Sequence, residues 1–180
     1  MNSDPKVKAT GRNNRIVLET ERLLLREFLP LDADSFYFLN KDKDVMQYTG
    51  DRAFETIQES RVFIENYDAY QKTGMGRWTV VEKATGEIIG WCGLKKHSNE
   101  MIDLGYRFHK LYWNQGYATE ASRACLDYGW NSLKLHCIIG RTAADNLASI
   151  RVLEKIGMTF WKKAPCEGIE NSVYYRIYST

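Results

Sequence analysis

The stretch "YWNQGYATEA", residues 112–121, decides the fold. It follows the apolar run "MIDLGYRF" and opens the amphipathic run "TEASRACLDYGW", so it joins a predicted strand to a predicted helix. Gly116 permits an unusual backbone angle, and Ala118 keeps the approach to the helix start open. Free N–H groups and the helix dipole favour an anion there. The stretch predicts a phosphate or pyrophosphate cradle; a plain glycine at a helix start is the alternative.

The flanking sequence places this helix in a chain where strands and helices are mixed. Strands are predicted at 22–28, 77–83, 87–94, 101–108, 135–142 and 172–179. Helices are predicted from Asp32, over 56–71, from Gly116 and over 145–158. This order predicts an α/β (α+β) fold, with a mixed sheet of six to seven strands and about four helices.

Helix-boundary residues support two of these helices. Thr56 is followed three residues later by Glu59, which is the spacing of a capping box. Either Asp145 or Asn146 can cap the last helix, and Gly157 is placed to end it.

Composition narrows the class of protein. The 180 residues predict one domain with a buried core, and a net charge of +2 argues against a nucleic-acid partner. No apolar run approaches the ~20 residues of a membrane helix. The cysteines and histidines lack a metal-binding spacing, so we expect reduced thiols, no metal and a cytoplasmic location.

The first residues differ from the rest of the chain. Residues 1–15 hold four basic residues and one acidic residue without an apolar stretch, which excludes a secretory signal. We expect a flexible basic arm at 1–15 and a single domain at 16–180.

The chain resembles the GNAT superfamily of N-acetyltransferases, and within it the ribosomal-protein N-acetyltransferase (RimJ/RimL-like) branch. "YWNQGYATEA" is similar to the family's acetyl-coenzyme-A loop, and the resemblance extends in register from about Leu18 to Tyr178. The other matching stretches are "LETERLLLREF", "GEIIGWCGL", "IDLGYRF" and "ADNLASIRVLEKIGM".

The resemblance implies acetyl-CoA as the cosubstrate and a set of residues that hold it. Main-chain groups of Phe108, His109 and Lys110 would bind the pantetheine arm. Loop amides would bind the pyrophosphate, from Asn114, Gln115, Gly116, Tyr117, Ala118 and Thr119. The branch commonly has glycine where Asn114 stands, but asparagine tolerates left-handed backbone angles.

The resemblance also implies catalytic candidates. Asp103 is the first candidate for the general base, with a pKa expected to be raised in a partly dry cleft; the alternative is a solvated strand residue. Glu120 is a second candidate, but we expect it to order the loop or helix instead. The family's usual tyrosine acid is replaced by Leu153, which moves the acid role to Ser149.

Asn146 matches an asparagine that contacts the cofactor arm. The residues alone favour a helix cap for Asn146 and a polar residue in a first turn for Ser149, and the resemblance favours the functional roles instead.

The function implied is transfer of an acetyl group from acetyl-CoA to a primary amine of a protein N-terminus or a small molecule, by direct attack through a tetrahedral intermediate. The alternative is a non-catalytic acyl-CoA-binding sensor or regulator. Acidic and aromatic residues would suit a cationic amine, and those considered are Asp42, Asp44, Trp78, Trp91 and Tyr106. No membrane partner is expected, and a homodimer is left open.

Overall fold

The computed structural model describes residues 15–166 and 168–179, and these residues contain one eight-stranded sheet in the order β1-β2-β3-β4-β5-β6-β8-β7. The strands are β1 (Ile16–Glu19), β2 (Leu23–Arg26), β3 (Gly76–Glu82), β4 (Ile88–Lys96), β5 (Ile102–Phe108), β6 (Cys137–Ala143), β7 (Thr159–Lys163) and β8 (Ser172–Tyr178). The helices are α1 (Ala33–Lys41), α2 (Lys43–Met46), α3 (Ile57–Glu65), α4 (Ala69–Thr73), α5 (Tyr117–Asn131) and α6 (Leu147–Lys155). Short 3-10 turns cover Pro30–Asp32 and Lys110–Tyr112.

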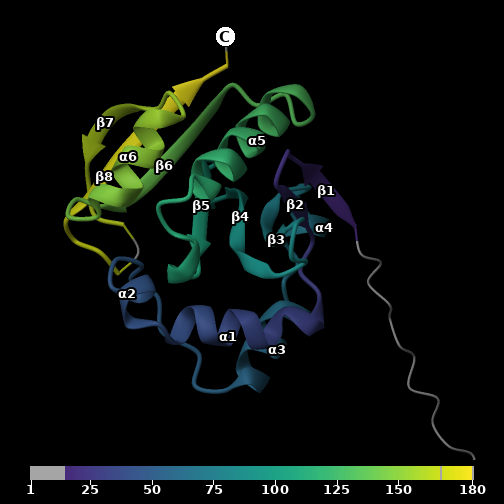
Figure 1. Ribbon diagram of the computed structural model, residues 1–180. Helices are drawn as coiled ribbons and strands as arrows, with labels where there is room; N and C mark the ends of the chain where they lie inside the picture. Colours follow the sequence, from purple (N-terminus) through teal and green to yellow (C-terminus); the bar gives the residue numbers. More distant parts are fainter. Residues whose placement is uncertain (1–14, 167, 180) are drawn as a thin grey trace, which may run out of the picture.

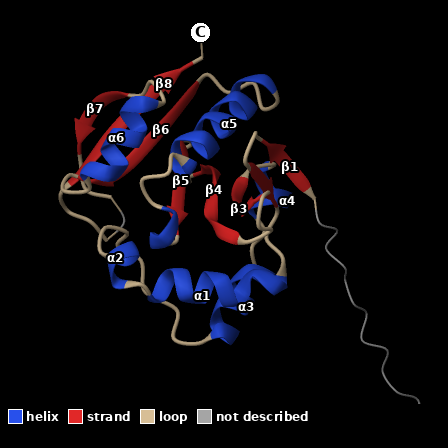
Figure 2. Cartoon of the chain, viewed as in Figure 1, coloured by secondary structure: helices blue, strands red, loops and turns tan. Residues whose placement is uncertain are grey.

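Helices cover both faces of the sheet (Figures 1 and 2). On one face, α5 packs on β4 and β5, and α6 packs on β6. The main core lies beneath them and includes Trp78, Leu94 and Leu104. On the other face, α1 and α3 enclose a smaller aromatic core around Phe28 and Phe36. The amphipathic pattern of each helix therefore has an apolar partner on the sheet.

The sheet is split at its centre, where β5 and β6 separate. These are its parallel neighbours, and within the described residues they pair only at Asp103–Ile139 and Leu104–Gly140. Beyond Leu104 and Gly140 the two strands diverge, which Figure 1 shows as a widening gap in the sheet. The other neighbouring strands are antiparallel. The carboxyl ends of β5 and β6 therefore form the two walls of a split.

The predicted mixed fold is confirmed, with differences in detail. The sheet has eight strands where six to seven were expected, because β1 and β7 were not predicted. The helix predicted over 56–71 is broken into α3 and α4, since the chain leaves helical geometry between them. The predicted arm at 1–15 lies outside the described residues except for Arg15.

Several predicted boundaries are confirmed. The Thr56 hydroxyl accepts a hydrogen bond from Glu59 N at 3.1 Å, and the Asn146 carbonyl oxygen accepts one from Ser149 N at 3.1 Å. Gly157 has a left-handed φ of 90° after α6.

Cys92, Cys125, Cys137 and Cys166 are free thiols. None of the helices described has the length and apolar character that crossing a membrane requires.

Candidate active site

A cavity of about 860 Å³ passes through the split. On the side of α5 and α6 it is lined by residues of both helix starts, among them Gly116 and Ser149. On the side of α1 and α3 it is lined by Trp91, Asp103 and Arg107. The cavity therefore connects the predicted anion cradle with a second chamber on the opposite face of the sheet.

The loop before α5 has the geometry of an anion cradle. Gly116 is the N-cap of α5 with a left-handed φ of 83°, and Asn114 is also left-handed at 60°. A Cβ on Gly116 would stand 3.5 Å from Arg22, an ordinary contact, so backbone angle rather than crowding selects glycine here. The expectation that Asn114 tolerates a left-handed angle is confirmed. Asn114, Gly116, Tyr117, Ala118 and Thr119 all line the cavity, whereas Gln115 does not.

Glu120 fixes this loop to the edge of the sheet. Its carboxylate accepts hydrogen bonds from Arg22 N at 3.0 Å, from Arg22 Nε at 2.6 Å and from the Thr20 hydroxyl at 2.5 Å. Arg22 in turn donates to the Gln115 carbonyl at 3.0 Å and lies over the ring of Tyr117. Burial opposes the charge of Glu120, but the hydrogen bonds outweigh it and lower its pKa. Glu120 thus orders the loop, as expected, and its lowered pKa makes it a poor base.

The main-chain groups of β5 that face the cavity differ in part from those predicted to bind pantetheine. The His109 N–H donates to the Ile89 carbonyl of β4 at 3.0 Å, so this amide points away from the split. Because peptide groups alternate along a strand, the main chain of Phe108 and Tyr106 points toward it. Phe108 and Tyr106 line the cavity, whereas His109 and Lys110 do not. The Phe108 carbonyl accepts a hydrogen bond from the Trp113 indole at 2.8 Å.

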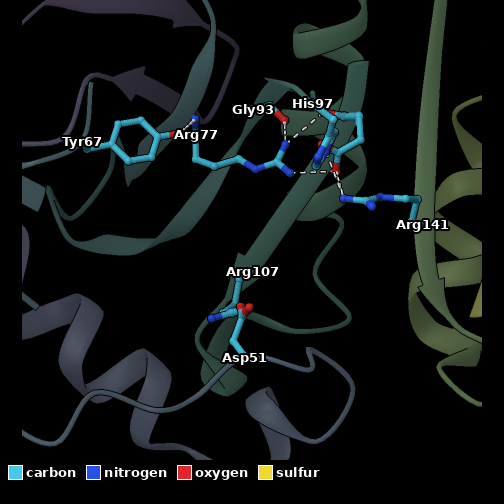
Figure 3. A network of polar contacts seen from close by, with 8 residues as sticks. Asp51, Tyr67, Arg77, Gly93, His97, Arg107 and Arg141 are labelled. Carbon is cyan, nitrogen blue, oxygen red and sulfur yellow. Dashed lines mark hydrogen bonds and ion pairs between the residues drawn. The ribbon is translucent and has the colours of Figure 1, made fainter. Parts of the chain in front are cut away.

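Asp103 lies at the point where β5 and β6 part, and it is 4 % exposed. Its carboxylate binds Arg77 Nη2 at 2.8 Å and His97 Nε2 at 2.5 Å, with Arg141 at 3.7 Å (Figure 3). Burial alone would raise the pKa of Asp103, but Arg77, His97 and Arg141 outweigh it and hold the pKa well below its usual range. The expected rise in this pKa is therefore wrong, and the residue is not solvated on its strand.

Arg77 was missed by the sequence analysis and is the centre of this network. Its guanidinium also donates to the carbonyls of Gly93 at 2.6 Å and Asp103 at 3.0 Å. A Cβ on Gly105 would lie 2.6 Å from the Arg77 guanidinium carbon, so only glycine at this position avoids a clash with Arg77. "LGYRF" is similar to the family's strand, but nothing in the local sequence indicates that residue 105 faces residue 77.

Asn146 and Ser149 lie together on the opposite wall of the split. Both line the cavity in the first turn of α6, where the Asn146 carbonyl oxygen caps the helix. The Tyr106 hydroxyl donates to the Ser149 carbonyl at 3.1 Å and so links β5 to α6 across the split. Burial raises the pKa of Tyr106 strongly. Leu153, at the position of the family's tyrosine, is 2 % exposed and belongs to the main core.

The chamber beside α1 and α3 differs from the one expected. Trp91 and Asp44 line the cavity, and so does Tyr106, but the Tyr106 side chain lies on the face of α5 and α6, where it reaches Ser149. Trp78 does not line it, because it is 1 % exposed and packs against Tyr128 in the main core. Asp42 caps α2 by accepting a hydrogen bond from Asp44 N at 2.9 Å. Arginines predominate where acidic residues were expected: Arg77, Arg107 and Arg141.

A split mixed sheet, a helix N-terminus at its mouth and a cavity through it define an acetyltransferase of the GNAT type. The model of the acetyltransferase (GNAT) domain family matches residues 22–159, and the chain belongs to this family. The uncharacterized N-acetyltransferase YnaD of Bacillus subtilis is 32% identical, over 89% of this chain and 95% of that protein.

Solved structures agree in fold. A GNAT-family acetyltransferase from Bacillus anthracis has a TM-score of 0.75 and 32% identity, over 89% of this chain and 96% of that one. The microcin C7 self-immunity acetyltransferase MccE, solved in complex with acetyl-CoA and AMP, has a TM-score of 0.76 over 89% of this chain and 94% of that one. Its 19% identity limits that comparison to the fold.

Proposed function

We propose that the chain is an N-acetyltransferase that takes the acetyl group of acetyl-CoA and transfers it to a primary amine within the split. The observation that carries this proposal is the single cavity that joins the loop of Gly116 to the chamber of Trp91 and Arg107. MccE supports it, because that fold neighbour was solved with acetyl-CoA bound. The loop and late-helix motifs resemble those of the ribosomal-protein N-acetyltransferase branch, and we place the chain near that branch on this resemblance alone.

The residues present fit acetyl-CoA. The left-handed backbone at Asn114 and Gly116 exposes the first N–H groups of α5 for the pyrophosphate. The main chain of Tyr106 and Phe108 would receive the pantetheine arm, and Asn146 and Ser149 face it from α6. When bound, acetyl-CoA supplies an acyl carbon that is open to attack by nitrogen. These residues would hold it and keep water away.

The reaction has a simple balance. An ammonium group loses one proton to become an amine, the nitrogen forms a bond to the acetyl carbon, and the carbon–sulfur bond breaks. The nitrogen loses a second proton, and the thiolate gains one. We assign the thiolate's proton to the Ser149 hydroxyl, directly or through water.

We assign Asp103 a positioning role rather than that of the base. A carboxylate with a lowered pKa accepts protons poorly, and its two oxygens already hold Arg77 and His97. We assign the amine's proton instead to His97, an imidazole that lines the cavity and whose Nε2 is held by Asp103 at 2.5 Å and Arg141 at 3.0 Å.

Thiol release from acetyl-CoA, followed with a panel of primary amines and product masses, tests this function. We expect one acetylated amine for each thiol released. His97→Gln should lower kcat more than it raises KM, and Ser149→Ala should lower kcat about tenfold or more. Tight binding of acetyl-CoA with no acetylated product across the panel would favour the non-catalytic acyl-CoA-binding regulator instead.

A further inference from the structure

Arg107 is a buried cation whose partners differ in burial. Its side chain is 8 % exposed and lies over Trp91, with the guanidinium carbon 5.2 Å from the ring centroid. Nη1 donates to the side-chain oxygen Oδ1 of Asn40, which is buried in α1, at 2.7 Å. Nη2 is paired with Asp51, whose side chain is 61 % exposed (Figure 3). One half of this guanidinium is thus held by the fold, and the other half by an exposed loop carboxylate.

The other arginines of this face are paired differently. Arg26 holds Asp32 with two hydrogen bonds of 2.7 and 2.6 Å, and that carboxylate is completely buried. Asp32 also accepts from Thr79 and Leu29 N, which closes the group off from the cavity. Arg77 is enclosed by Asp103 and two carbonyls. Arg52 also lines the cavity, but its own side chain is 65 % exposed and it pairs with Glu55 and Glu59. Arg107 combines a buried position in the cavity wall with a partner that solvent can reach.

The charges around Arg107 favour an anion over a second cation. The cavity is lined by seven lysine and arginine side chains against three carboxylates, Asp44, Asp51 and Asp103. The seven cations are Arg52, Arg77, Lys95, Arg107, Arg141, Arg151 and Lys155. Burial lowers the pKa of Arg107, although its hydrogen bond and ion pair with Asp51 oppose this. A polyamine would add like charge to this chamber, which is unfavourable. An acceptor that carries a carboxylate would instead add negative charge beside Arg107, which is favourable.

We propose that the acceptor is an amine that also carries a carboxylate, as in an amino acid, and that this carboxylate binds Arg107 in the place that Asp51 occupies when no acceptor is present. Arginine is suited to this because its planar fork meets a carboxylate with two hydrogen bonds. The amide of Asn40 lies beside it, and Trp91 supplies an apolar wall. The proposal rests on the proposed acetyl transfer and names its substrate class.

The test compares amino acids with their own amides as acceptors, for example phenylalanine with phenylalaninamide, together with a polyamine. The two members of each pair have the same side chain and amino group, and they differ only in having a carboxylate or a carboxamide. The amide's amino group is less basic, so at neutral pH more of it is present as the free amine that can attack. A preference for the acid at neutral pH therefore cannot arise from a larger supply of free amine. We expect kcat/KM of the wild type to favour the acid about tenfold or more. Equal or better acetylation of the amide or the polyamine would overturn the proposal.

Substitutions at Arg107 and Asp51 test whether the preference for the acid arises at this ion pair. Arg107→Met should lower kcat/KM about tenfold or more further for the acid than for the amide. Arg61→Met on α3, outside the cavity lining, is the matched control and should keep the preference. Asp51→Asn removes the exposed carboxylate that competes for Arg107 and should lower KM for the acid only. An equal effect of Arg107→Met on both acceptors, or no effect of Asp51→Asn on KM, would contradict the assignment.

Failure of the underlying function gives a different result. If no amine is acetylated by a folded sample that binds acetyl-CoA, acetyl transfer itself is wrong. If amines are acetylated without regard to a carboxylate, only the substrate class is wrong.

Discussion

Asp103 shows how a residue's role depends on neighbours that are distant in sequence. Its position in the strand resembles that of an acidic residue facing the acceptor, but its carboxylate is buried between Arg77, His97 and Arg141. Their positive charge outweighs the cost of burial, so the carboxylate remains ionised. We therefore expect Asp103 to hold the two walls of the split together where β5 and β6 part.

The lowered pKa of Asp103 predicts a pH dependence of stability. The pKa is lower in the folded chain than in the unfolded chain, so the unfolded chain binds more protons in acid. The stabilisation is present above the unfolded pKa of about 3.9 and is lost as pH falls below it. Asp103→Asn should lower the free energy of unfolding by about 3 kcal/mol at neutral pH. Denaturant titrations from neutral to acid pH should show this difference shrinking.

Asp127→Asn, on an exposed position of α5, is the control for that series. Its free energy of unfolding should follow the wild type at every pH. A constant difference between Asp103→Asn and the wild type down to strongly acid pH would contradict the account.

At the scale of elements, the N-terminus of α5 is positioned by the β1–β2 connection. Glu120 in the first turn of α5 binds Thr20 and Arg22, and Arg22 reaches back to the Gln115 carbonyl. Three segments are thereby fixed around the left-handed Gly116. A cradle that is already in place loses less conformational entropy when an anion binds.

Glu120→Gln tests this positioning. Glutamine preserves the shape but removes the charge that holds Arg22, so the loop should become less ordered. Hydrogen bonds to charged groups contribute about 1.5–3 kcal/mol, so we expect KM for acetyl-CoA to rise several-fold with little change in kcat. Steady-state kinetics with Asp127→Asn as the control measure this. A fall in kcat with unchanged KM would point to a role in the chemistry instead.

At the scale of the whole molecule, α5 and α6 cover one face of the sheet and α1 and α3 the other, and the split connects the two faces. A cosubstrate that enters from the α5 side would contact both walls of the split. Binding should therefore stabilise the sheet as a unit and not only the loop.

Linkage gives the size of that stabilisation. Acetyl-CoA at about 100 times its Kd should raise the free energy of unfolding by about 2.7 kcal/mol, provided the unfolded chain does not bind it. Denaturant unfolding with and without acetyl-CoA measures the change. Hydrogen exchange should slow in both β5 and β6, and protection confined to residues 112–121 would contradict binding through the split.

Much of the local structure could be predicted from the sequence, because local interactions determine it. The Thr56 and Asn146 caps, Gly157 and the left-handed Asn114 and Gly116 are properties of a few neighbouring residues. β1 and β7 were missed because they are short outer strands without clear alternation.

The polar network of the site could not be predicted, because its members are far apart along the chain. Asp103 lies 26 residues from Arg77, and its partner Arg141 is on another strand. Whether a carboxylate has a raised or a lowered pKa depends on such contacts. Likewise, Arg107 meets Asn40 and Asp51 only when α1 and the loop after α2 fold over β5.

The central claim is that acetyl-CoA binds at the left-handed loop of Gly116, and calorimetric titration tests it most directly. The wild type should bind acetyl-CoA with micromolar Kd, and Gly116→Trp should abolish measurable binding. Gly74→Trp is the matched control, because Gly74 is also left-handed, at φ 68°, and a Cβ there would meet no atom within 4 Å. It carries a similar backbone cost of about 1–2 kcal/mol. Binding by the wild type and Gly74→Trp but not by Gly116→Trp is the predicted result. Binding retained by Gly116→Trp, or absent from a folded wild type, would contradict the account.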